Sequence, residues 1–163
     1  MYYKEDWEQA KKNLEAFWAG EDIGRPLMAV TSPRTEKSKK FPELQYGPWT
    51  GSMDTYGDND LEAITRWWTD PEENLKHMIY WFENTFFGGE ALPATHTNWG
   101  ASAAAAFFGS PPKFNKNSVW YPAVIEDWES WKWQFDEKTN KWWKAIKDIV
   151  AHLNASADRK SVV

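Results

Sequence analysis

The sequence predicts an α/β fold with a parallel sheet, because helical and extended segments alternate along the chain. Helix-type apolar spacing marks the segments 6–19 and 71–87 and a further stretch that ends near residue 153. The short run 27–31 between the first two helices is almost wholly apolar, as strands are when both faces of a sheet are covered. Alternation of this kind is typical of parallel sheets.

The first predicted helix covers residues 6–19. Asp6, followed by Gln9 three positions later, forms a capping-box pattern, and Gly20 is a natural C-terminal stop. The apolar face of this helix consists of Trp7, Ala10, Leu14, Phe17 and Trp18. The first strand, 27–31, follows Arg25-Pro26. A long polar stretch, 35–56, comes next and is predicted to be a loop that could cover a site.

The second helix, 71–87, has the clearest signals of all. Asp70 is its predicted N-cap, Pro71 occupies the first helical position, and Gly88-Gly89 ends it. The remaining predicted elements are a strand over 90–95, an Ala-rich helix over 101–108, an extended segment over 118–125, a connection over 126–133, a helix from Asp136 or Thr139 to about Leu153, and a strand that begins at Val162.

Composition limits the classes of function. The 163 residues suit one domain, 1–163, with a net charge of -5 and no cysteine. The acidic balance argues against a nucleic-acid partner, and the missing cysteines exclude disulfides and thiolate metal sites in this chain. The longest apolar run, 103–108, is too short to span a membrane, and the charged N-terminus lacks a signal-peptide pattern. We therefore expect a soluble, cytoplasmic protein.

Several segments, in this order, resemble the N-terminal half of the uroporphyrinogen decarboxylase-like family. The segments are NLEAFWAGE (13–21), RPLMAV (25–30), WTDPE (68–72), FGGEALP (87–93) and WYPAVIEDW (120–128). The resemblance implies a (β/α)8 barrel whose active cleft lies at the C-terminal ends of the strands. Such a barrel usually needs about 250 residues, so we expect a partial barrel that ends before its ring could close.

The resemblance also implies two families of chemistry. Members include decarboxylases that act on a tetrapyrrole and methyltransferases that move a methyl group between a corrinoid and a thiol. Only Arg34 stands in for the arginines that bind substrate carboxylates in the decarboxylases, and Glu90 occupies the place of their essential aspartate. The sequence around Arg34 differs from the substrate-binding segment of the decarboxylases, and this difference argues against decarboxylation of uroporphyrinogen itself. The zinc ligands of the methyltransferases belong to a later half, so the resemblance places no metal site here.

The residues alone offer candidate sites with structural alternatives. Arg34 follows a strand and could hold a carboxylate through two hydrogen bonds, or it could be an exposed loop residue. Glu90 opens a strand, where acids more often serve stability than chemistry. His96, Asn98 and Trp99 follow the second predicted strand and could transfer a proton, form hydrogen bonds and stack on a flat ligand.

Tyr121 flanks the third extended segment and is a further binding candidate, whereas the neighbouring acids Glu126 and Asp127 more often cap a short helix. The predicted catalytic residues are thus His96 and Glu90. The predicted substrate-binding residues are Arg34, Asn98, Trp99 and Tyr121.

Three functions compete. The first is part of a uroporphyrinogen decarboxylase-like enzyme that binds a small anionic or methyl-donor ligand once its barrel is complete. The second is a carbohydrate-binding module that uses some of the 13 tryptophans, and the third is a truncated fragment without catalysis. An open barrel has sheet edges, so we expect self-association or pairing with a C-terminal half. The sequence identifies no cofactor.

Overall fold

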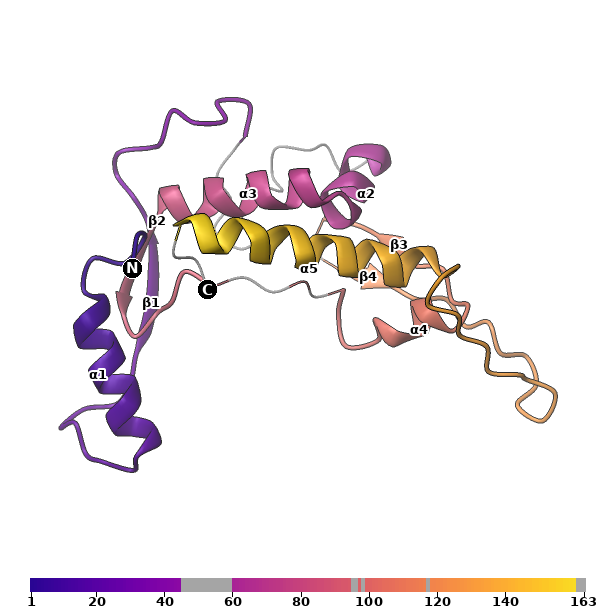
Figure 1. Ribbon diagram of the computed structural model, residues 1–163, viewed down its shortest axis with the longest axis horizontal. Helices are drawn as coiled ribbons and strands as arrows, with labels where there is room; N and C mark the ends of the chain where they lie inside the picture. Colours follow the sequence, from indigo (N-terminus) through magenta and orange to yellow (C-terminus); the bar gives the residue numbers. More distant parts are fainter. Residues whose placement is uncertain (45–59, 95–96, 98, 117, 161–163) are drawn as a thin grey trace.

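The computed structural model describes residues 1–44, 60–94, 97, 99–116 and 118–160, with side chains to residue 156. Two helices, α3 (Pro71–Asn84) and α5 (Lys141–Lys160), lie side by side at its centre and run in the same direction (Figure 1). Helix α1 (Trp7–Trp18) and a two-stranded sheet lie at one end, and a long arm over residues 121–139 extends from the other. The chain thus presents two separate ends.

The sheet at the first end pairs β1 (Ala29–Pro33) with β2 (Thr85–Gly89) in antiparallel register. We expected a parallel sheet, which is wrong for this pair, because its two strands are antiparallel. The second strand was predicted over 90–95 and lies earlier, at Thr85–Gly89. Helix α3 stops at Asn84, three residues before its expected end, because Thr85 to Phe87 are β-branched and aromatic residues that suit a strand.

The strand β2 ends at Gly89, which has a φ of 58°. A side chain there would collide with the Met28 carbonyl oxygen, so glycine is required where the two strands approach. The described residues form two small antiparallel sheets and no closed barrel. A partial (β/α)8 barrel stays a prediction, which these sheets neither confirm nor exclude.

Local signals place the helix ends correctly in two cases. The Asp70 carboxylate accepts hydrogen bonds from the N–H groups of Glu72 and Glu73 at 2.9 and 3.0 Å, which confirms it as the cap of α3. Gly20 ends α1 with a φ of 75°. Asp6, however, does not cap α1, because its carboxylate pairs with the buried ammonium of Lys4 at 2.8 Å.

Two apolar clusters hold the helices together. The first lies between α3, β2 and the N-terminus and consists of Tyr3, Met78, Phe82, Phe87 and Ala91. The second joins helix α2 (Leu61–Thr69), for which the sequence predicted no element, to α5 and to β3 (Lys113–Phe114). Trp99 lies at the centre of this second cluster and is only 2% exposed.

The remaining elements are shorter than expected. Helix α4 (Ala104–Phe107) is a single turn, and β4 (Val119–Trp120) pairs with β3 over two residues. Helix α5 begins at Lys141, where Asn140 Oδ1 accepts a hydrogen bond from the N–H of Trp143 at 3.0 Å. The start that we expected at Asp136 or Thr139 is therefore a few residues early. No helix of the described part is long and apolar enough to cross a membrane.

Candidate functional site

The predicted catalytic acid Glu90 lies directly after β2, and its side chain is buried. Arg25 donates two hydrogen bonds to the carboxylate, at 2.6 and 3.0 Å. Asn13 Nδ2 and the backbone N–H of Met28 each donate another at 2.8 Å. Both oxygens therefore have partners, and Glu90 ties α1, the segment before β1 and the end of β2 together.

This network holds the carboxylate in its ionised form. The hydrogen bonds from Arg25, then those from Asn13 and Met28, lower the pKa of Glu90 from the ordinary value of 4.5 to about 2. A carboxylate with such a pKa is a poor general acid or base near neutral pH, because catalytic groups work best when their pKa lies near the pH of the reaction. The geometry assigns Glu90 a structural role.

The guanidinium group of Arg34, the predicted carboxylate-binding residue, also forms hydrogen bonds within the chain. Its Nε donates a hydrogen bond to the Thr85 carbonyl oxygen at 3.1 Å, and one terminal nitrogen pairs with Glu5 at 2.9 Å. Arg34 follows Pro33 at one end of the strand pair, whereas Glu90 follows Gly89 at the other. Five strand residues separate the two ends by about 15 Å, so these side chains do not share a site.

The structure does bring Trp99 and Tyr121 together, but as parts of the core. The Trp99 indole N–H donates a hydrogen bond to the Trp68 carbonyl oxygen at 3.1 Å, and the Tyr121 hydroxyl donates one to the Trp99 carbonyl oxygen at 2.8 Å. Burial raises the pKa of Tyr121. Trp99 packs edge-on against Phe114 and Trp142, so its ring offers no free face to a ligand.

Two predicted site residues, His96 and Asn98, lie outside the described residues. The described part contains no group of histidine and acidic side chains that could hold a metal ion. His77, to which the sequence assigned no role, is buried against Trp67, and burial, followed by the charge of Lys76, lowers its pKa to about 4. It is therefore neutral at pH 7 and belongs to the packing of α3.

A concave site of the described part lies elsewhere, at the base of the arm. This cleft has a volume of about 720 Å³ and is formed by residues 106–109 and 111, by residues 131–136 of the arm and by residues 139–142. We call it the arm cleft. Clefts of about 300–1,000 Å³ are the usual size for small-molecule sites.

Aromatic rings form the walls of the arm cleft. Trp133 meets Phe108 edge-to-face at 5.3 Å between ring centres, and Trp131 meets Trp133 at 6.4 Å with an angle of 83°. Phe135 in turn packs edge-on against Trp143 of α5 at 5.6 Å. The alternation of tryptophan with polar residues over 131–133 was the only sequence signal for this site, and it did not reveal which rings meet.

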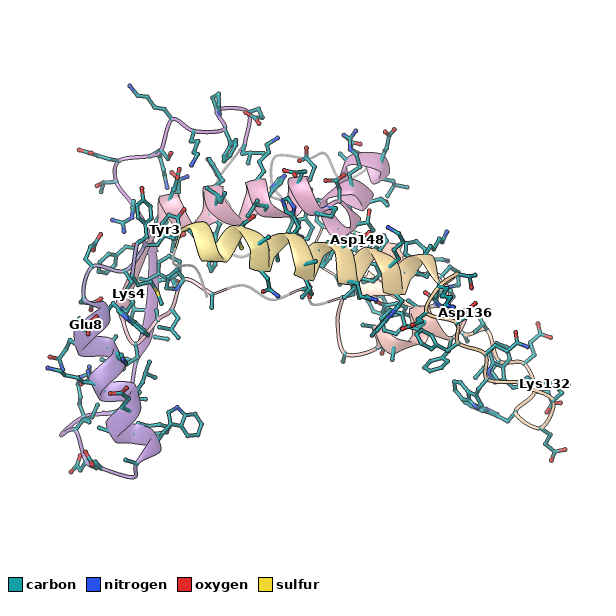
Figure 2. All side chains as sticks on the ribbon, viewed as in Figure 1. Tyr3, Lys4, Glu8, Lys132, Asp136 and Asp148 are labelled. Carbon is teal, nitrogen blue, oxygen red and sulfur yellow. The ribbon has the colours of Figure 1, made fainter. Side chains whose placement is uncertain are left out.

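The charged side chains of the cleft differ in whether they have a partner among the described residues. The Asp136 carboxylate accepts hydrogen bonds from the Lys138 N–H at 2.9 Å and from the Thr139 hydroxyl at 3.0 Å. Lys132 and Lys141 form no ion pair with any described residue, although the Lys141 ammonium lies 4.4 Å from the centre of the Trp142 ring. Figure 2 shows Lys132 out on the arm and Asp136 nearer to α5.

Comparison of the chain with protein-family models, with curated proteins and with solved structures finds no match.

Proposed function

We propose that this chain is the N-terminal part of a cytoplasmic uroporphyrinogen decarboxylase-like protein, of the decarboxylase or corrinoid-dependent methyltransferase type, and that it is inactive alone. In this proposal the chain contributes a surface for assembly with further protein. Support for the ancestry comes from the ordered sequence segments between residues 13 and 128 that resemble the family. Support for the assembly comes from the exposed sheet.

The observation that carries the assembly part of the proposal is the outer face of the β1–β2 sheet. All five residues of β1 are exposed, and Val30 and Phe86 are 51% and 42% exposed. Val30 lies opposite Gly88, and the ring of Phe86 covers Gly88 on the same face. We call Val30, Ser32, Phe86 and Gly88 the outer sheet face. The opposite face carries Phe87, which is buried in the first core cluster.

Only one face of this sheet is covered, since Phe87 packs against α3 in the first core cluster and the outer sheet face stays exposed. Sheets usually contain more than two strands, so a further strand or a covering layer on this face would stabilise it. An exposed apolar edge strand is also a template for pairing with another chain. Met28, directly before β1, is a further apolar residue and is 54% exposed. We therefore expect the chain to associate through this end.

Two candidate residues support the proposed inactivity of the isolated chain. Glu90 and Arg34 are engaged in internal hydrogen bonds and lie at opposite ends of the sheet. A barrel enzyme of this class draws its catalytic residues from several strand ends around a closed ring. The described strands do not provide such a ring.

The test combines two measurements on the purified chain. Light scattering over a range of concentrations should show oligomers, and assays for porphyrinogen decarboxylation and for methyl transfer to a thiol should show no turnover. Turnover by the chain alone would contradict the proposed inactivity. A monomer at all concentrations would contradict the proposed assembly surface, and the two results are independent of each other.

We do not propose a carbohydrate-binding module. Sugar platforms built from tryptophan need rings in a common plane, so that the faces of several sugars can stack on them. The rings of the arm cleft meet at steep angles instead, 83° between Trp131 and Trp133 and 88° between Phe108 and Trp133.

A further inference from the structure

We propose that the arm cleft binds a small aromatic anion, such as an aromatic carboxylate. This site lies at the opposite end of the molecule from the outer sheet face (Figure 1) and does not depend on the proposed assembly. The inference is based on the shape of the aromatic walls, on the unpaired cations and on a buried indole donor without an acceptor.

The aromatic walls suit a flat ring. Aromatic pairs prefer edge-to-face and offset-stacked arrangements, because the ring edge is positive and the face negative. Trp133 and Phe108 stand at right angles, so a ring that enters between the arm and α5 can stack on one of them while its edge meets the other. Trp133 is 62% exposed and is thus accessible to such a ligand.

The cations favour a negative charge on the ligand. Lys132 and Lys141 both line the cleft and have no ion-pair partner in the described part. The single acidic side chain in the lining, Asp136, is engaged with the Lys138 N–H and the Thr139 hydroxyl. Lys132, Lys141 and Asp136 together give the lining one net positive charge, whereas the chain as a whole carries a net charge of -5. An ammonium that lies over an aromatic ring, as Lys141 does over Trp142, is held near the cleft.

An unsatisfied donor adds a third observation. The indole nitrogen of Trp131 is buried and has no hydrogen-bond partner among the described residues. Buried donors are normally paired, and each exception calls for an explanation. A ligand oxygen is the acceptor that this N–H lacks. The nitrogen is covered in the structure, so the indole must turn for the two to meet.

The probe that tests this proposal is 2-naphthoate, with the neutral 2-naphthylmethanol as its matched control. Binding is followed through the indole N–H signals of the ¹⁵N-labelled full chain, with the Trp131 and Trp133 signals assigned by substitution. We expect saturable shifts of these two signals with 2-naphthoate. The signal of Trp128, which lies on the same arm but outside the cleft lining and is 71% exposed, should not move.

Two variants and one control locate the site. Trp133→Ala should weaken binding at least about fivefold, because it removes an aromatic wall. Lys141→Gln should weaken 2-naphthoate binding by up to about fivefold, the usual limit for an exposed charge pair, without affecting the neutral probe. Lys147→Gln removes an exposed charge further along α5, outside the lining, and should have no effect.

Three results would overturn the proposal. One is the absence of saturable shifts at Trp131 and Trp133. Another is equal affinity for the acid and the alcohol, which would show that the cations play no part. The third is an equal effect of Lys141→Gln and Lys147→Gln, which would indicate nonspecific attraction to α5. Trp133 and Lys141 are exposed, so neither substitution should unfold the chain.

Discussion

At the scale of single residues, Glu90 shows how a catalytic candidate can serve the fold. Its position next to β2 is the one that the family resemblance marks for chemistry. Its carboxylate nevertheless binds Arg25, Asn13 and the Met28 N–H, which come from segments more than 60 residues earlier in the chain. The sequence shows all of these residues but not that they meet, because their contact depends on the folding of α1 against the sheet.

Replacement of Glu90 by glutamine should destabilise the chain at pH 7 by about 2 kcal/mol, since charge-assisted hydrogen bonds are replaced by weaker neutral ones and Arg25 loses its partner. Urea denaturation measures the free energy of unfolding. Glu129→Gln is the matched control, because Glu129 is exposed, and it should change that free energy by less than about 0.5 kcal/mol. Equal effects of the two substitutions would contradict the structural role of Glu90.

Comparison of the natural chain with Glu90→Gln also predicts how the free energy of unfolding depends on pH. The pKa of Glu90 is lowered from 4.5 to about 2 in the folded chain, so the unfolded chain binds the proton more readily. The stabilisation from Glu90 is complete above pH 4.5 and is lost as the pH falls toward 2. The difference in unfolding free energy between the natural chain and Glu90→Gln should therefore shrink below pH 4.5. A constant difference from pH 7 to pH 3 would contradict the lowered pKa.

At the scale of the elements, helix ends follow local chemistry. Asp70 caps α3 through hydrogen bonds to Glu72 and Glu73. Asp70→Ala should cost about 1 kcal/mol of stability, whereas Asp70→Asn, which keeps an acceptor, should cost much less. Chemical denaturation of both variants separates the cap from a general effect of the lost charge. Equal losses in the two variants would assign the effect to the charge instead.

Trp99 connects three elements of the second cluster, α2, β3 and α5. It contacts Phe114 of β3 and Trp142 of α5 and donates a hydrogen bond to the end of α2. Trp99→Ala should therefore destabilise the chain by about 4 kcal/mol, in the range for a buried aromatic residue. Trp120→Ala is its matched control, because Trp120 is 66% exposed and should cost less than about 1 kcal/mol. A loss of stability in Trp99→Ala as small as that in Trp120→Ala would mean that the second cluster does not stabilise the fold.

The elements also show what the sequence could predict. The end of α1 at Gly20 and the cap of α3 at Asp70 were predicted correctly, because glycine and aspartate act on their own neighbours. The strand pairing was predicted wrongly, because Phe86 fits both the helical stripe and a strand, and only the contact with β1 decides between them. The arm cleft could not be predicted, since residues 106–109, 131–136 and 139–142 meet only through the arrangement of α4, the arm and α5.

At the scale of the whole molecule, the two ends have different properties. The sheet end presents Val30 and Phe86 beside the buried Phe87, whereas the arm end carries a cleft with charged side chains. Figure 2 shows Lys4 near the sheet end and Lys132 on the arm, with the paired helices between them. These properties are the basis on which we propose association at the first end and ligand binding at the second.

The most direct test of this account is sedimentation velocity of the natural chain, Val30→Lys and Leu61→Lys over a range of concentrations. Val30 belongs to the outer sheet face, whereas Leu61 is an equally aliphatic residue, 62% exposed, at the start of α2. We predict that the natural chain and Leu61→Lys form oligomers and that Val30→Lys dissociates at about tenfold higher concentration, because burial of a valine contributes about 1.5 kcal/mol. Oligomers that are equally stable in all three proteins, or monomers throughout, would contradict association through the outer sheet face.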